Sequence, residues 1–279
     1  MTTFLYGAHV HANGIRQHYL RYGGAEGPRA ARDAVIIVPG ITSPAVTWGF
    51  VGERFGRHFD TYILDVRGRG LSEASESLDY GLDPQAADVI AFAEAMNLMR
   101  YAIVGHSMGG RIGLRAARSK PEGLQRLVMV DLPVSGPGRR LYPAQLAWYV
   151  DSIRLANQGI DIEGMRKFCP TWTEAQLHLR TEWLHTCDER AIVASFEDFQ
   201  KEDIHADMPK VSVPVMLMVA GRGDVIRDED IDEIRLLMPA VSVTRAPNAG
   251  HMIPWDDEEG FYHAFGDFLG ATLVNEHIA

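Results

Sequence analysis

A serine stands in a short turn between two glycines at residues 105–110, which read G-H-S-M-G-G. Ser107 follows an apolar run, residues 101–104, and precedes a helix-like stretch, residues 111–118. A serine that attacks a carbonyl has to project its oxygen from a very tight turn, and the flanking glycines remove the Cβ atoms that would clash there. The strand–turn–helix setting therefore predicts that Ser107 is a nucleophile.

A base and an acid for this serine follow later in the chain. His251 lies in N-A-G-H-M-I-P-W, after a β-rich run and before an amphipathic helix. Asp131 closes the apolar run 127–130, and Asp224 follows the apolar run 215–219. A hydroxyl needs a base to become a good nucleophile, and the imidazole needs a carboxylate to fix its tautomer and stabilise its charged form. The sequence predicts a serine–histidine–aspartate triad in which either aspartate is the acid.

Composition and charge bound the class of protein. A length of 279 residues suits one domain with an insertion, or at most two domains. The chain is 46% hydrophobic and 23% charged, which is typical of a globular enzyme with a sizeable core. Its formal net charge of −10 argues against binding to nucleic acid or to an anionic membrane. Recognition of an acidic substrate would therefore need a local cluster of arginines.

The remaining motifs concern compartment and cofactors. Cys169 and Cys187 form no C-x-x-C pair, so we expect two buried thiols in a reducing compartment. We expect neither a signal peptide nor a membrane span, and a cytoplasmic location follows. No zinc, phosphate-loop or dinucleotide motif appears, so neither a metal nor a cofactor is expected. The oligomeric state is not constrained.

The elements that must position the triad alternate along the chain. An alternating segment at 15–22 predicts a strand, which ends in a turn cluster of Gly23, Gly24, Gly27 and Pro28. Apolar strands are expected at 34–38, 61–65, 101–104, 127–130 and 213–219, and helices at 48–59, 84–98 (with Asp83 as N-cap) and 258–269. This alternation indicates an α/β fold with a mainly parallel sheet covered by helices on both faces.

The alternation breaks between residues 135 and 207. This segment is aromatic, charged and helix-like, lacks buried strands, and contains three of the five tryptophans. A plain connection of that length would be unusual. We interpret it as a helical cap, residues 135–207, inserted after strand six into a core formed by residues 1–134 and 208–279.

Over nearly its full length the chain resembles the α/β-hydrolases, and within them the N-formylmaleamate deformylases of bacterial nicotinate degradation. The narrower resemblance rests on six segments, 6–24 (Y-G-A-H-V-H-A-N-G-I-R-Q-H-Y-L-R-Y-G-G), 38–50, 64–72, 133–140 (P-V-S-G-P-G-R-R), 182–187 (E-W-L-H-T-C) and 248–257. It implies an α/β-hydrolase fold and hydrolysis of a small anionic amide, N-formylmaleamate, to formate and maleamate through a formyl-enzyme. A carboxylesterase or lactonase is the alternative function, and a non-catalytic receptor of the same fold is a second alternative.

The resemblance also bears on the triad acid and on the oxyanion hole. Asp224 holds the commonest acid position of the fold and Asp131 the alternative position, so we favour Asp224. Backbone amides of Met108, at the start of the helix after the nucleophile, and of Ile41, in V-P-G-I-T-S-P, are the expected oxyanion donors.

Two arginines at the entrance to the cap are candidates for binding the substrate. Arg139 and Arg140 lie in S-G-P-G-R-R and could each bind the maleamate carboxylate with two hydrogen bonds. A solvated surface charge is at least as good an interpretation for each, and Arg111 is equally open.

Overall fold

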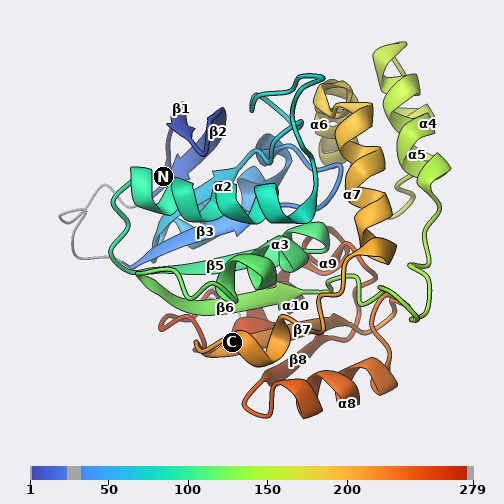
Figure 1. Cartoon of the computed structure of the whole chain (residues 1–279). Helices are drawn as coiled ribbons and strands as arrows, with labels where there is room; N and C mark the ends of the chain where they lie inside the picture. The colour runs from blue at the N-terminus through green and yellow to red at the C-terminus, as the bar shows by residue number, and fades with distance from the viewer. Residues whose placement is uncertain (1, 24–32, 275–279) are drawn as a thin grey trace.

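The chain forms one mixed, mainly parallel β-sheet in the computed structural model, which describes residues 2–23 and 33–274. Within these residues the sheet has eight strands in the order β1-β2-β4-β3-β5-β6-β7-β8 (Figure 1). The strands are β1 (Phe4–Ala12), β2 (Ile15–Tyr22), β3 (Ala34–Val38), β4 (Asp60–Leu64), β5 (Tyr101–His106), β6 (Leu124–Val130), β7 (Val215–Ala220) and β8 (Ser242–Ala246). The pairs β1–β2 and β2–β4 are antiparallel, and the other neighbouring pairs are parallel.

Helices cover both faces of this sheet, as the sequence predicts. In Figure 1, α2 and α3 lie in front of the sheet and α10 behind it. The core helices are α1 (Gly49–Phe55), α2 (Leu82–Ala95), α3 (Met108–Ala117), α8 (Asp228–Leu237), α9 (Ile253–Asp256) and α10 (Glu258–Phe265), with a 3₁₀ helix η2 (Ala45–Trp48) before α1. Every residue of β3, β5 and β7 is buried, because strands covered on both faces need apolar side chains at every position.

The stretch between β6 and β7, which is described throughout, contains helices and no strand. Its helices are α4 (Leu146–Asn157), α5 (Ile162–Arg166), α6 (Glu174–Trp183) and α7 (Glu189–Lys201), with 3₁₀ helices η3 (Leu184–Thr186) and η4 (Met208–Lys210). Figure 1 places α4–α7 together, beside the end of the sheet where the parallel strands finish. We keep residues 135–207 as our interpretation of the cap.

The structure departs from the expected elements at β1 and at the start of α2, and the helices α1 and α10 end earlier than expected, at Phe55 and Phe265. β1 was not predicted, because most of its residues are exposed and its apolar alternation is weak. The helix expected at 84–98 begins at Leu82 with Gly81 as its N-cap. Asp83 instead accepts hydrogen bonds from Arg115 and Arg118 of the neighbouring helix. Most of the turn cluster expected after β2, at Gly24, Gly27 and Pro28, lies outside the described residues.

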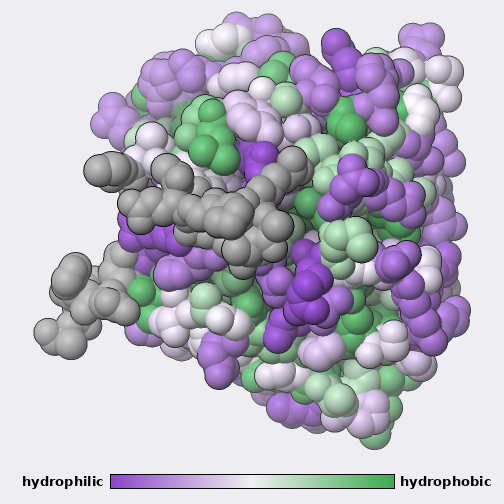
Figure 2. All heavy atoms as spheres, turned by 90° about the vertical axis from the view of Figure 1, so that its left-hand side faces the viewer, coloured by the Kyte–Doolittle hydropathy of each residue, from purple (hydrophilic) through white to green (hydrophobic). Residues whose placement is uncertain are grey.

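The outer surface is mixed in character. Figure 2 shows the side opposite the cap helices, where hydrophilic residues are spread between smaller groups of hydrophobic ones.

Within the described chain, no helix combines the length and the apolar character needed to cross a membrane. Cys169 and Cys187 are buried free thiols, as predicted, and burial raises the pKa of Cys187 to about 12.

Candidate active site

Ser107 occupies the strained turn that the glycine spacing predicts. It links β5 to α3 and has φ 54° and ψ −119°, an unfavourable conformation for a residue with a side chain. A Cβ on Gly105 would lie 2.1 Å from the carbonyl oxygen of Gly109, and one on Gly109 would lie 1.9 Å from the carbonyl oxygen of Val38. Both positions therefore require glycine for the serine to stand at this corner.

Ser107, His251 and Asp131 form one continuous chain of polar contacts. His251 Nε2 lies 3.0 Å from Ser107 Oγ, and His251 Nδ1 lies 2.7 Å from Asp131 Oδ2. Asp131 is buried at the end of β6, and its Oδ1 accepts a hydrogen bond from the amide of Ala220 at 3.1 Å. A carboxylate that accepts Nδ1–H leaves the lone pair of Nε2 facing the serine, which is the arrangement a general base needs.

Asp224, which the sequence favours as the acid, does not reach the histidine. Its side chain is 59% exposed and forms an ion pair with Arg227, with 2.7 Å between Asp224 Oδ1 and Arg227 Nε. The hydrogen bond from Arg227 holds the pKa of Asp224 below its usual range. The preference for Asp224 is thus wrong, because the loop after β7 turns its side chain outward at the rim of the site. Asp131, directly after β6, points at the imidazole ring.

The expected oxyanion donors lie beside Ser107. A Cβ on Gly40 would be 3.5 Å from Ser107 Cβ, so the loop that carries Ile41 approaches the serine closely. Among the residues described, the amides of Ile41 and Met108 donate to no backbone or side-chain acceptor. The buried Arg69, which sequence reasoning missed, donates from Nε to the carbonyl of Ile41 at 3.1 Å. This bond fixes the loop and leaves both amides available for a substrate oxygen.

His106 supports the backbone of the catalytic histidine candidate. Its Nε2 lies 2.9 Å from the carbonyl oxygen of His251, and its ring is buried. Burial lowers the pKa of His106 to about 3, so the ring stays neutral and donates from Nε2.

We expect the buried His106 to make folding stability depend on pH. The unfolded chain binds a proton on this residue below its ordinary pKa of 6.5, whereas the folded chain binds it only near pH 3. Stability is therefore full above pH 6.5 and falls as the pH drops, by up to about 1.4 kcal/mol per unit from this group. Urea unfolding between pH 7 and pH 4.5 measures this slope in the wild type and in His106→Asn. Equal slopes in the two proteins would contradict the assignment.

A cavity of about 570 Å³ lies over the triad and is walled largely by the cap. Ser107, His106 and His251 form part of its lining, together with residues 40–43. The cap contributes aromatic side chains, namely Tyr142, Trp148, Tyr149, Phe168 and Trp172. The Tyr142 hydroxyl lies 3.2 Å from His251 Nε2, and burial raises the pKa of Tyr142 well above its usual value. A neutral phenol thus stands next to the reacting atoms, which sequence reasoning did not predict.

Arg139 and Arg140, the predicted partners of a substrate carboxylate, do not line the cavity. Both terminal nitrogens of the Arg139 guanidinium donate to Glu233, Nη2 at 2.6 Å. Arg140 pairs with Asp230 and donates to the carbonyl of Val225 at 3.0 Å. The expectation that Arg139 and Arg140 bind the substrate is therefore wrong. Their ion pairs with acidic residues of α8 attach the first residues of the cap to that helix and neutralise both arginines.

The arginine that does line the cavity is Arg180 of α6. It is buried, and sequence reasoning missed it. Leu177, Arg180 and Leu184 are all buried at a spacing of three and four residues, so the arginine stands on the apolar face of its helix. An arginine on the apolar face of a predicted helix is the sequence signal that could have identified Arg180 as a residue of the site.

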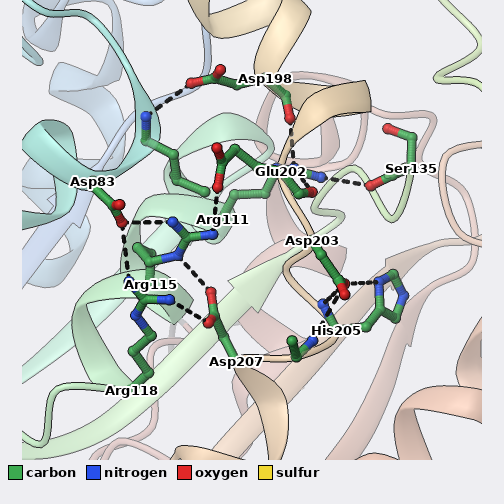
Figure 3. Close-up of polar contacts among 12 residues, drawn as sticks. Asp83, Arg111, Arg115, Arg118, Ser135, Asp198, Glu202, Asp203, His205 and Asp207 are labelled. Atoms are coloured by element: carbon green, nitrogen blue, oxygen red, sulfur yellow. Dashed lines mark hydrogen bonds and ion pairs between the residues drawn. The ribbon is translucent and has the colours of Figure 1, made fainter. Parts of the chain in front are cut away.

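Arg111, the third arginine considered from the sequence, is fully buried in α3 and does not line the cavity. Its guanidinium donates to four backbone carbonyls, all at 2.9 Å, namely those of Pro133, Ser135, Asp198 and Glu202. Figure 3 shows Arg111 with Ser135, Asp198 and Glu202 around it. Two of these residues lie where the cap begins and two where it ends. Arg111 therefore joins both connections of the cap to the helix that follows the nucleophile.

Replacing Arg111 by methionine is expected to destabilise the fold by about 3–5 kcal/mol, because four buried carbonyls lose their donor. Urea unfolding at pH 7 measures the change. Arg154→Gln is the control, since Arg154 and its partner Glu189 are both exposed and their ion pair contributes little. Unfolding of Arg111→Met at the wild-type midpoint would refute this role.

No group of three or more metal-ligating side chains is present among residues 2–23 and 33–274.

Comparisons with known proteins agree with this architecture. A family model described as "alpha/beta hydrolase fold" matches residues 33–258. The chain is 60% identical to the N-formylmaleamate deformylase of Pseudomonas putida KT2440, over 98% of this chain and 100% of that protein. The crystal structure of the N-formylmaleamic acid deformylase Nfo of Pseudomonas putida S16, a serine-to-alanine variant, superposes with a TM-score of 0.87 at 49% identity. This superposition covers 93% of this chain and 99% of the Nfo chain. The structure of E-2-(acetamidomethylene)succinate hydrolase, with a TM-score of 0.76, 20% identity and coverage of 96% and 100%, shows the shared fold alone.

Proposed function

Since the chain belongs to the alpha/beta hydrolase fold family, we propose that it cleaves the formamide C–N bond of N-formylmaleamate to give formate and maleamate. The observation that carries the chemistry is the unbroken contact chain from Ser107 through His251 to Asp131 at the floor of the cavity. The choice of N-formylmaleamate as the substrate rests on the 60% sequence identity with the deformylase of Pseudomonas putida KT2440.

The first half of the reaction forms a formyl-enzyme. Ser107 Oγ attacks the formyl carbon while His251 Nε2 takes the hydroxyl proton, and Asp131 stabilises the resulting imidazolium. The amides of Ile41 and Met108 donate to the oxygen that becomes negative. His251 then gives its proton to the departing nitrogen, the C–N bond breaks, and maleamate leaves. The leaving group is an amide, so this bond breaks more easily than a peptide bond.

The second half releases formate. Water takes the place of the leaving group, His251 accepts a proton from it, and the hydroxide attacks the formyl ester. The ester bond to Ser107 breaks, and His251 returns a proton to the serine oxygen. The formyl group is the smallest acyl group, so it needs almost no acyl pocket beside Ser107. The reaction as written needs neither a metal nor a cofactor.

The test is release of formate from N-formylmaleamate by the purified protein, with maleamate measured in parallel. We expect equal amounts of the two products. If no formate appears while 4-nitrophenyl acetate is cleaved, the protein is a serine esterase or lactonase of other specificity, and the deformylase proposal fails. A cytoplasmic location belongs to the same proposal and is supported by the two buried free thiols.

A further inference from the structure

Arg180 is a buried cation that faces the cavity without an acidic partner. Its side chain belongs to the cavity lining, and the residue is 3% exposed. Its two hydrogen bonds are long, at 3.3 Å from Nη1 to the carbonyl of Thr42 and 3.3 Å from Nη2 to Thr42 Oγ1. Within the described residues its Nε has no acceptor and the guanidinium forms no ion pair. Donor capacity is therefore left over on this fork.

Other buried arginines of this protein are compensated, for example by an acid or, in Arg111, by four backbone carbonyls at 2.9 Å. Arg67 pairs with Asp88 at 2.6 Å, and Arg115 pairs with Asp207 at 2.6 Å. Burial of a charge costs free energy unless an opposite charge or several hydrogen bonds compensate for it. Arg180 has no opposite charge and only two long hydrogen bonds, so the cavity in front of it suits an anion that enters from solution.

Two tryptophans hold the guanidinium in place. The Arg180 Cζ lies 5.7 Å from the ring centroid of Trp148 and 5.4 Å from that of Trp172. Aromatic rings near a guanidinium stabilise its charge and fix its plane, while leaving the N–H groups at its edge free to donate. The two rings thus pre-organise the fork for a planar carboxylate.

The carboxylates that line the cavity are already engaged. Asp224 pairs with Arg227 at the rim. Asp256 Oδ1 accepts a hydrogen bond from Thr171 at 2.9 Å, and its Oδ2 accepts one from the amide of Gly250 at 3.0 Å. Neither side chain forms an ion pair with Arg180, so its guanidinium keeps donors and a positive charge for an incoming anion, although Asp256 adds a negative charge to the same cavity wall and the chain as a whole carries −10.

The position of Arg180 determines how far apart the acyl carbon and the negative end of a bound substrate can be. It contacts Thr42, the residue that directly follows Ile41, and consecutive Cα atoms lie about 3.8 Å apart. Its guanidinium therefore stands next to the loop that supplies the proposed oxyanion donor. A substrate that reaches both groups has only a few atoms between its acyl carbon and its negative end.

We infer that Arg180 binds the carboxylate of the substrate and thereby selects short acyl amides with an anionic end. This inference rests on the proposed deformylase function. The two N–H groups at the edge of the guanidinium donate to the two carboxylate oxygens, in place of the weak contacts with Thr42.

The test compares N-formylmaleamate with its neutral methyl ester in formate-release assays. Arg180→Gln should lower kcat/KM for the anionic substrate by about 100- to 1,000-fold, mainly through KM, and lower it less than about 3-fold for the ester. Arg180→Lys should recover only part of the loss, because an ammonium lacks the planar fork. Arg154→Gln is the matched control, since Arg154 lies on cap helix α4 and pairs with Glu189 in solvent. We expect it to match the wild type on both substrates.

An equal loss on both substrates would overturn the inference and make Arg180 a support for the Thr42 loop. A second measurement keeps this test independent of the proposed function. Inhibition of 4-nitrophenyl acetate hydrolysis by maleate should be about 100-fold weaker in Arg180→Gln than in the wild type. If the wild type releases no formate but this difference is seen, the deformylase proposal fails and the anion site stands. An unchanged inhibition constant refutes the anion site.

Discussion

Ser107→Ala is expected to lose about 10⁵- to 10⁶-fold in kcat for formate release, because it removes the oxygen that forms the formyl-enzyme. The residual rate would come from the oxyanion donors and from the binding of substrate. Formate is measured under single-turnover conditions with enzyme in excess, so that a slow residual reaction is still counted.

A matched control keeps this prediction specific. Ser119→Ala removes the same atom from an exposed serine in the turn after α3 and should leave activity unchanged. Thermal unfolding should show that Ser107→Ala is folded, since the strained backbone at this position disfavours alanine no more than serine. Near-wild-type activity in folded Ser107→Ala would exclude a formyl-enzyme on Ser107. The reaction would then have to proceed in this cavity by another mechanism.

Asp131→Asn is expected to lower kcat by about 10⁴-fold while leaving the fold intact. The carboxylate accepts the Nδ1 proton of His251 at 2.7 Å, whereas an amide in its place can turn an N–H toward that nitrogen. The imidazole then carries its proton on Nε2 and cannot take one from Ser107. The pH–rate profile of the variant should show the activity returning at high pH, where hydroxide replaces the base.

Asp224→Asn is the matched control for this experiment, because it tests the other candidate for the triad acid. The same isosteric change at Asp224 removes only a solvent-exposed ion pair with Arg227, so kcat should stay within about 2-fold of the wild type. Loss of activity in Asp224→Asn with an active Asp131→Asn would reverse the assignment of the acid. Loss in both would indicate that the rim loop and the buried acid act together.

The sequence alone determined the features that depend on neighbouring residues. The serine turn was predictable because its steric demand falls on glycines two positions to either side, and the structure shows the clashes that other residues would make. Continuous apolar strands between helices indicated the parallel sheet. The one missed strand, β1, is mostly exposed and therefore carries little hydrophobic pattern.

The tertiary structure decided which residues, distant in sequence, meet at the site. Asp131 and Asp224 both follow apolar strands, and only the direction of each side chain shows that Asp131 reaches His251 across 120 positions of sequence. The arginines followed the same rule: Arg139 and Arg140 are neutralised by α8, while Arg180 faces the cavity. Local patterns fix which elements form, because their steric and hydrophobic causes lie within a few residues. Partners of a charged side chain come from remote segments, so only the packed chain reveals them.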